Sequence, residues 1–404
     1  MKITDVRHLT LTGPRVHSVG GSAGTISKVI VRIDTDAGIY GLGEAENFMG
    51  VREALQLLRN CLIGRSPLTV RPFFSEMIYG TLPPYPAGGA APGHPGYCSP
   101  TATTSGPIIW GLSGVEMALC DLAGKILRTP TYNLFGGTYR EKVRIYLDRS
   151  APEDVTNLDA WRDMAIKTVE AGFTQLKFDI DFAAPDAVED PWSRRLVRPH
   201  LNRVIERITA VRECLGWDVE LAADCHMHFN VSDAIQLVQE LAPLKLMWIE
   251  DPVPITNPDA CREVREKSTI PICVGEMFTA EIARIFIDQK ACDIIHPDVL
   301  FTGGLHETRR IADYAELHYM PLALHNNGGC LATIAAGHVA AATRNFTGME
   351  YHFIETDWIG SYVRREGLPF LKDGHLPLSD APGLGVELNE EVCRKNLAPG
   401  EKLF

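Results

Sequence analysis

The chain has 404 residues, of which 45% are hydrophobic and 22% are charged, and its formal net charge at pH 7 is −12. These values are typical of a globular protein with a large buried core, and they argue against nucleic acid or an anionic membrane as a partner. A small anionic substrate is still compatible, because a bound cation and a lysine can reverse the potential within one pocket.

The N-terminal residues MKITDVRHLTLTG alternate like a β-strand and lack the basic start and apolar stretch of a signal peptide. No apolar run approaches the length of a membrane span. We therefore expect a cytoplasmic protein. The ten cysteines form no Cys-x-x-Cys pair, and we expect them to be reduced.

Residues 1–130 predict a small α+β capping domain. Three strand-like runs, ITDVRHLTL, SKVIVRIDT and IYGLGEA, precede helical patterns in VREALQLLRNCL and IIWGLSGVEMALCDLAGKIL. Two stretches are interpreted as long loops, TGPRVHSVGGSAGT and residues 80–106, and we expect both to close over the mouth of the next domain. In the second loop, Tyr85, His94 and Tyr97 are candidate substrate contacts, although this loop can equally serve a subunit interface.

Residues 131–368 alternate between strand and helix patterns. Eight strand-like runs occur in the order VRIYL, TQLKF, VELAA, LKLMWI, IPICVG, CDIIH, MPLAL and TGMEY. Eight such units predict an α/β fold, a (β/α)8-type barrel. The segment 369–404 contains no further unit, and we expect it to pack back on the N-terminal α+β capping domain and complete it.

Three carboxylates close successive predicted barrel strands. Asp224, Glu250 and Glu276 each follow an apolar run, and both intervals between them are 26 residues, near the roughly 30 of one strand-helix unit. A barrel would place them on one rim, where three anions repel one another unless a cation lies between them. Oxygen ligands without a nearby cysteine or histidine triplet favour Mg²⁺. The spacing therefore predicts a magnesium site.

The remaining strand ends also carry polar residues, within the motifs KFD, ADCH, WIEDP, VGE, HPDVLFTGG, LALHN and GMEYH. This ordered set resembles the enolase superfamily, in its mandelate racemase subgroup, and the resemblance covers essentially the whole chain. Members of that superfamily abstract the proton α to a carboxylate. Removing that proton places a second negative charge on the substrate, which Mg²⁺ on the three carboxylates would stabilise.

The resemblance also implies catalytic side chains. Lys177 adds a second cation, although it can also be an ion-pair partner of Asp179 or of a metal ligand. His325 is the candidate general base, and Asp298 on the neighbouring strand fixes its tautomer. Glu350 matches a glutamate that hydrogen-bonds the developing charge, for which it needs a raised pKa, and its alternative role is a salt bridge at the rim.

Histidine 226 separates the reactions within the family. His226 lies two residues after Asp224, so on a continuing strand it shares the ligand's face. In galactonate-type and mannonate-type dehydratases, a histidine at this Asp-x-His position resembles the general acid that protonates the departing hydroxyl. Mandelate racemase instead resembles Lys-x-Lys on strand two, where this chain has Asp179. We interpret His228 as a loop residue and His296 as a packing residue beside His325.

The sequence therefore predicts a magnesium-dependent hydro-lyase that converts a sugar acid, galactonate or gluconate in preference to mannonate, to a 2-keto-3-deoxy acid. One alternative is a racemase or epimerase that uses His325 and Lys177 as two bases. Another is a binding protein that has lost turnover. Similar proteins commonly form dimers or octamers, so we expect a homo-oligomer, and neither the substrate's stereochemistry nor the role of Asp179 follows from the sequence.

Overall fold

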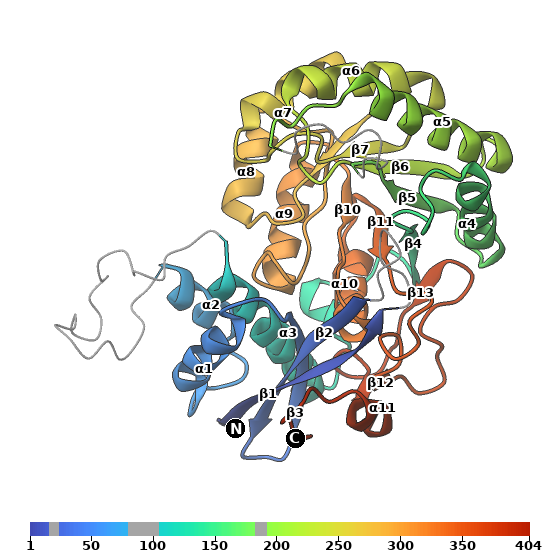
Figure 1. The fold of residues 1–404 in the computed structure, drawn as a ribbon. Helices are drawn as coiled ribbons and strands as arrows, with labels where there is room; N and C mark the ends of the chain where they lie inside the picture. Colours follow the sequence, from blue (N-terminus) through green and yellow to red (C-terminus); the bar gives the residue numbers. More distant parts are fainter. Residues whose placement is uncertain (16–23, 80–104, 182–191) are drawn as a thin grey trace.

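The computed structural model describes residues 1–15, 24–79, 105–181 and 192–404 (Figure 1). The candidate contacts Tyr85, His94 and Tyr97 lie outside the described residues. Within the described residues, an antiparallel sheet with three helices lies beside a closed barrel of parallel strands, which confirms the predicted fold class. No helix of these described segments combines the length and the apolar character that a membrane span needs.

The capping sheet has the strand order β1-β2-β3, with β1 Ile3–Arg15, β2 Gly24–Thr35 and β3 Tyr40–Glu46. The first two strands are longer than predicted, because Thr12 to Arg15 continue to pair with β2 instead of opening into a loop. Pro14 fits there because β1 is an edge strand, where a missing N–H leaves no ladder bond unmade. The described residues that follow form three helices, α1 Val51–Leu62, α2 Val70–Tyr79 and α3 Pro107–Leu127.

Strand β3 runs close against helix α3. A Cβ atom on Gly43 would lie 2.0 Å from the carbonyl oxygen of Gly114, and one on Gly41 would lie 2.1 Å from that of Ala118. Both positions therefore require glycine. The capping sheet and helix α3 therefore pack as two layers in direct contact.

Eight parallel strands, all within the described residues, form the barrel in the order β4 to β11, and pairing of β11 with β4 closes it. The strands are β4 Lys142–Asp148, β5 Gln175–Asp179, β6 Glu220–Asp224, β7 Trp248–Glu250, β8 Ile272–Val274, β9 Ile294–Ile295, β10 Leu322–Leu324 and β11 Phe346–Tyr351.

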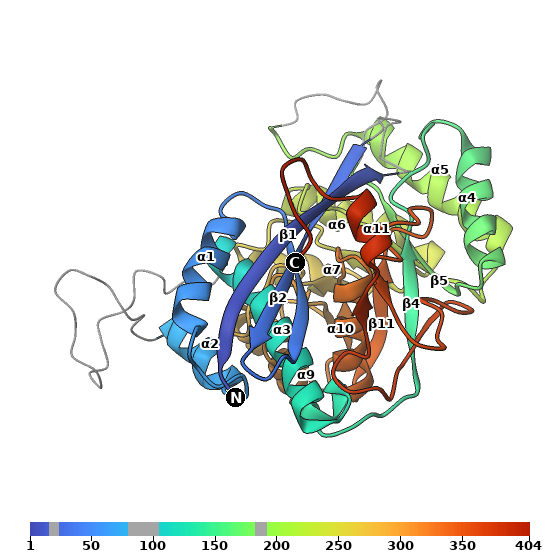
Figure 2. The same ribbon diagram turned by 90° about the horizontal axis from the view of Figure 1, so that it is seen from below.

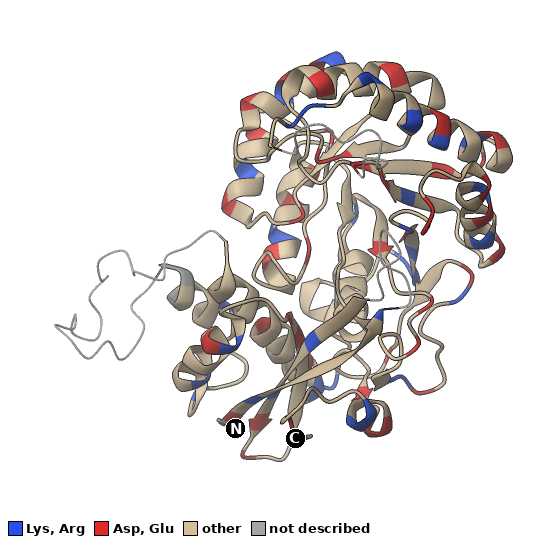
Figure 3. Ribbon diagram, in the orientation of Figure 1, with Lys and Arg blue, Asp and Glu red and all other residues tan. Residues whose placement is uncertain are grey.

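In the part of the barrel that the structure describes, one α-helix follows each of the first seven strands: α4 Leu158–Glu170, α5 Arg198–Leu215, α6 Val231–Leu241, α7 Pro258–Lys267, α8 Ala280–Asp288, α9 Leu305–Leu317 and α10 Cys330–Ala342. Acidic and basic residues alternate along the outer helices of the barrel (Figure 3).

The C-terminal segment contacts both parts of the molecule. Strand β13 His375–Pro377 pairs antiparallel with β4, and β12 Val363–Arg364 pairs with β14 Glu387–Leu388. Beyond helix α11, Glu390–Lys395, the chain runs along the edge of the capping sheet, where Thr12 donates to the Asn396 carbonyl and Ala398 donates to that of Thr10. The segment thereby covers an edge that would otherwise be unpaired.

Two buried glutamates of the capping domain hold barrel helices by their N-termini. Glu116 on α3 accepts from the backbone N–H of Leu305 at 2.6 Å, at the start of α9. Glu44 on β3 accepts from Gly329 at 2.7 Å and from Ala332 at 3.0 Å, at the start of α10. A carboxylate at a helix N-terminus satisfies free N–H groups and complements the helix dipole. Seen from below, β1 and β2 lie across the barrel (Figure 2).

Candidate active site

The predicted site residues lie at the carboxyl ends of the barrel strands. Lys177 is in β5, Asp224 and Glu250 are the last residues of β6 and β7, and Glu350 is in β11. Glu276, Asp298 and His325 lie just beyond the ends of β8, β9 and β10. Since the strands are parallel, all these ends meet at one mouth of the barrel.

The Lys177 ammonium is the centre of a buried carboxylate cluster. Its Nζ lies 2.6 Å from Glu250 Oε1, 2.6 Å from Glu350 Oε1, 2.9 Å from Asp224 Oδ2 and 3.3 Å from Asp148 Oδ2. Burial alone would lower the pKa of Lys177, but these four carboxylates raise it well above its ordinary value. Lys177 is therefore charged, and its pairing with candidate metal ligands is observed directly.

The single positive charge of Lys177 does not neutralise all the carboxyl groups around it. The carboxyl groups of Asp224 and Glu250 share a hydrogen bond, which requires a proton between them, and burial followed by Asp224 raises the pKa of Glu250 well above its usual value. Burial and Glu276 likewise raise the pKa of Asp251. Among the described residues, the Oδ1 atoms of Asp179 and Asp251 are buried without a hydrogen-bond partner.

This excess of buried, close oxygen atoms fits a hard divalent cation such as Mg²⁺. Among the described residues, Asp179, Asp224 and His226 present ligand atoms within 4.8 Å of one another, and so do Glu250, Cys273 and His296. Neither group contains all three predicted ligands. Glu276 faces His325 instead, with Oε2 at 3.1 Å from Nε2.

His325 is held by acids at both ring nitrogens. Its Nδ1 lies 2.7 Å from Asp298 Oδ2, and its Nε2 lies near Glu276. Burial would lower the pKa of His325, but Glu350, Glu276 and Asp298 raise it well above its ordinary value. Both nitrogens donate in this arrangement, so His325 must release the Nε2 proton before it can accept one from a substrate.

His226 reaches the site by a route that differs from the sequence prediction. Strand β6 ends at Asp224, and His226 and Met227 have φ values of 43° and 60°, so the chain turns instead of continuing as a strand. This turn lets the His226 N–H donate to Asp224 Oδ1 at 2.9 Å. Its Nδ1 lies 3.1 Å from Asp181 Oδ1, and its Nε2 lies 3.7 Å from Asp224 Oδ2. Burial lowers the pKa of His226, but Asp224 and Asp181 raise it to about 11.

Glu350 does not have the raised pKa that hydrogen-bond donation needs. Burial would raise it, but the Lys177 ammonium, His325 and His352 hold the pKa of Glu350 well below its usual value. Glu350 Oε2 instead accepts from the Asn326 backbone N–H at 3.2 Å. The structure therefore presents Glu350 as an ionised acceptor.

Several neighbours of the site were not singled out from the sequence. His352 places Nε2 at 3.5 Å from Glu350 Oε1 and Nδ1 at 3.7 Å from Asp148 Oδ2. The GMEYH motif contains His352, so its position after β11 was a usable signal. Asp181, the partner of His226, follows the KFD motif by two residues and has no comparable signal. His296 is buried edge-on to His325, with ring centroids 6.0 Å apart, as expected.

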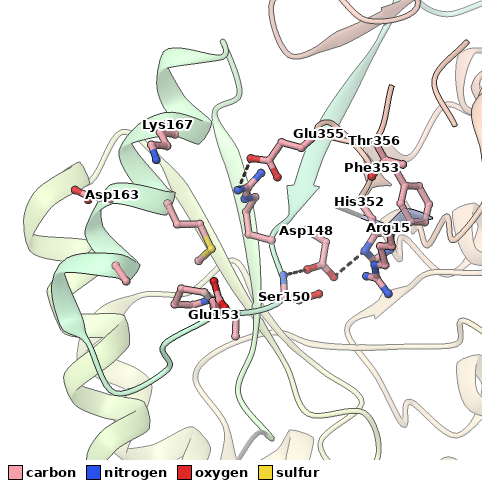
Figure 4. Close-up of a pocket in the computed structure, with 15 residues that line it drawn as sticks. Arg15, Asp148, Ser150, Glu153, Asp163, Lys167, His352, Phe353, Glu355 and Thr356 are labelled. Atoms are coloured by element: carbon pink, nitrogen blue, oxygen red, sulfur yellow. Dashed lines mark hydrogen bonds and ion pairs between the residues drawn. The ribbon is translucent and has the colours of Figure 1, made fainter. Parts of the chain in front are cut away.

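A cavity of about 290 Å³ adjoins the cluster between the β4–α4 connection and the segment after β11 (Figure 4). Figure 4 shows Asp148 and His352 facing each other in its wall. The other polar lining comes from both domains: Arg15, Arg149, Ser150, Glu153, Asp163, Lys167, Glu355 and Thr356. These side chains place hydrogen-bond donors and acceptors in the cavity wall.

Family models match both parts of the chain. Residues 2–136 match the mandelate racemase / muconate lactonizing enzyme N-terminal domain, and residues 160–392 match the enolase C-terminal domain-like family. The chain belongs to the mandelate racemase / muconate lactonizing enzyme family. The resemblance recognised in the strand-end motifs is thus confirmed.

Several named relatives of this chain are dehydratases of sugar acids. A D-xylonate dehydratase from Haloferax volcanii is 35% identical, covering 93% of this chain and 87% of the relative. An arabinonate dehydratase from Saccharolobus solfataricus is 31% identical, covering 90% and 89%. A crystal structure of a mandelate racemase/muconate lactonizing enzyme-like protein from Rubrobacter xylanophilus has a TM-score of 0.86 and 31% identity, covering 99% of this chain and 98% of the other. The predicted hydro-lyase class is confirmed by these relatives.

Proposed function

We propose that the protein dehydrates an aldonic acid in the presence of Mg²⁺ to give a 2-keto-3-deoxy acid. The observation that carries the proposal is the placement of two histidines, each backed by an aspartate, around the carboxylate cluster. His226 follows β6 and His325 follows β10, the third and seventh of eight barrel strands. These strands are four apart, so the two imidazoles lie on opposite sides of the mouth, an arrangement that suits an anti elimination with the base on one face and the acid on the other.

In this proposal, Asp224, Glu250 and Glu276 hold the cation. Bound there, Mg²⁺ would supply positive charge to the substrate carboxylate. Lys177 directs its ammonium to the same region. His325 takes the proton from C2 through Nε2, and His226 donates a proton to the C3 hydroxyl, which departs as water.

Two positioning roles complete the proposal. Asp298 orients His325 throughout the reaction. Glu350, as an ionised acceptor, holds Lys177 and the Asn326 backbone in place and does not donate a hydrogen bond. The enol that remains takes up a solvent proton at C3 and becomes the keto acid.

The contacts of Lys177 favour dehydration over racemisation. A second base would need an unprotonated amine, whereas the Lys177 ammonium is bound by four carboxylates that raise its pKa. His226 carries an aspartate partner and is cationic near neutral pH, which suits a general acid. We therefore propose that the racemase or epimerase alternative does not apply.

The identity of the aldonic acid is tested by a screen. The xylonate and arabinonate dehydratases among the relatives support a pentonic acid, whereas the HPD motif at 296–298 and the ALH motif at 323–325 resemble the galactonate type and favour galactonate or gluconate. We propose that the capping domain, residues 1–130, closes the substrate pocket and selects among these aldonic acids.

Stereoisomers of pentonates and hexonates, including mannonate, are incubated with Mg²⁺, and keto acid is detected with semicarbazide. Keto acid from at least one aldonate supports the proposal; none from the whole panel, with Mg²⁺ bound, contradicts it.

A further inference from the structure

A buried ion pair in the capping sheet lies close to the candidate base. Lys28 on β2 and Glu46 on β3 are cross-strand partners, and Lys28 Nζ lies 2.5 Å from Glu46 Oε1. Lys28 is fully buried and Glu46 is 3% exposed. A buried charge is costly unless its partners are well placed, so this pair is kept under tight geometric constraint.

The Lys28 ammonium also contacts the barrel. It donates to the backbone carbonyl of Asn327, two residues after His325. The N–H of Asn327 in turn donates to Asp298 Oδ2 at 3.0 Å. The same oxygen is the acceptor for His325 Nδ1 at 2.7 Å. A continuous chain of hydrogen bonds therefore runs from Lys28 through Asn327 and Asp298 to the imidazole of His325.

The rest of the loop after β10 is held from the barrel at Asn326 and from Glu44 of the capping domain at Gly329. Asn326 donates from its side chain to the Glu350 carbonyl at 3.0 Å and to Thr333 Oγ1 at 2.8 Å. The other oxygen of Asp298 accepts from the Leu300 N–H at 2.7 Å. These bonds position Asn326 and Asp298, but the Asn327 carbonyl itself is held by Lys28.

We propose that Lys28 is a positioning residue for the His325–Asp298 pair, acting from the capping domain through Asn327. The kinetic part of this inference rests on the proposed function. Without Lys28, the Asn327 carbonyl loses its buried donor. The backbone N–H of Asn327 then no longer holds Asp298 Oδ2 in one orientation. The His325 ring then loses part of its alignment. Small misplacements of a catalytic group cost about 10²-fold in rate.

The test compares Lys28→Met with the double variant Lys28→Met/Glu46→Met. The single variant leaves Glu46 buried without its cation. The double variant removes both charges and keeps apolar volume, so we expect it to be the less destabilised of the two. Both variants lose the donor to Asn327. Lys28→Arg retains a cationic donor and serves as the conservative rescue.

Lys125→Met is the matched control. Lys125 lies in the same domain and likewise donates to a carboxylate, Asp121 Oδ2 at 2.8 Å, and to a backbone carbonyl, that of Tyr40 at 3.2 Å. It has no bond to the loop after β10. This variant therefore reports the general cost of losing a capping-domain lysine.

Two measurements are made on each variant. The first follows the downfield proton NMR resonance of His325 Nδ1–H, assigned by its absence in His325→Asn; this needs neither substrate nor metal. The second follows kcat and KM with an aldonate that is turned over. In the single and double variants we expect an upfield-shifted or exchange-broadened resonance and a 10- to 100-fold lower kcat with KM changed less than twofold. Lys28→Arg recovers part of both, and Lys125→Met changes neither.

A double variant with the wild-type resonance and the wild-type kcat would overturn the inference. Failure of the proposed function is distinguishable from this result. If no aldonate is turned over by the wild type, but the resonance moves in the double variant and not in Lys125→Met, Lys28 still positions His325 while the assigned reaction is wrong.

Discussion

His325 Nδ1 lies 2.7 Å from Asp298 Oδ2, although the two residues are 27 positions apart in the chain. They follow adjacent strands, β10 and β9, so the parallel barrel brings them together. The bond assigns a proton to Nδ1 and leaves Nε2 as the atom that can exchange a proton with a substrate. This geometry determines the first prediction.

Replacing the candidate base removes turnover without removing the cation site. We expect His325→Asn to lower kcat by about 10²- to 10⁴-fold, the usual contribution of general acid–base catalysis. Mg²⁺ affinity, measured by calorimetry, should change little. A variant with more than half of the wild-type kcat would remove His325 from this role.

Replacing the candidate acid separates the two proton transfers. In His226→Asn, His325 is intact, so the C2 proton should still exchange with D₂O while loss of the C3 hydroxyl falls by about 10²-fold or more. Deuterium in the recovered aldonate is followed by NMR. His318→Asn, at the end of α9 and 39% exposed, is the control. Normal dehydration by His226→Asn would show that the proton comes from elsewhere.

Cation binding should appear as a gain in stability. A ligand present at 100 times its Kd raises the free energy of unfolding by about 2.7 kcal/mol. We expect Mg²⁺ to give such a gain in the wild type and in Asp159→Asn, whose side chain is 83% exposed. Asp224→Asn should lose most of it, because Asp224 is a proposed ligand. Equal gains in all three proteins, measured by thermal unfolding, would place the cation elsewhere.

Contacts between the domains should contribute to stability. Glu116 accepts two backbone N–H groups at the start of α9, from Leu305 and from His306 at 3.2 Å. Hydrogen bonds to charged groups contribute about 1.5–3 kcal/mol each, and glutamine keeps one acceptor. We expect Glu116→Gln to lower the free energy of unfolding, measured by urea denaturation, by about 2 kcal/mol. The control is Glu266→Gln, which should change this free energy little because the Glu266 side chain is 61% exposed. Equal unfolding free energies for the wild type and Glu116→Gln would show that the Glu116 charge is dispensable.

A buried histidine outside the active site predicts acid sensitivity. His338 Nδ1 accepts from the Tyr132 N–H at 3.1 Å, and burial lowers the pKa of His338 to about 4. The unfolded chain has a pKa near 6.5, so it binds the proton first, and stability falls as pH drops from 6.5 toward 4.

The measurement is a comparison of wild type with His338→Gln. Between pH 7.5 and pH 5.5, the wild type should lose about 1.3 kcal/mol more unfolding free energy than the variant. An equal loss in both proteins would mean that His338 titrates normally in the fold.

The barrel and the positions of its polar strand ends were predictable, because apolar runs mark buried strands and parallel strands place successive ends at one mouth. The arrangement of the side chains was harder to predict from the sequence. The left-handed turn at His226 is a local backbone conformation that spacing does not encode. Glu276 faces His325, which depends on packing between strands.

The link from Lys28 to Asn327 spans 299 positions and has no sequence signal. Helix α2 was also missed, and β1 and β2 are longer than predicted. The domain boundaries at residues 130 and 368 and the cytoplasmic location stay predictions. So do the homo-oligomeric state and the role of His228.

The reaction carried out in D₂O, with Mg²⁺ and the aldonate panel, tests the central claim most directly. We predict a 2-keto-3-deoxy acid that carries deuterium at C3, formed by the wild type and not by His325→Asn. Deuterium at C2 of the recovered aldonate, with no keto acid formed by the wild type, would contradict a dehydratase and indicate a racemase or epimerase.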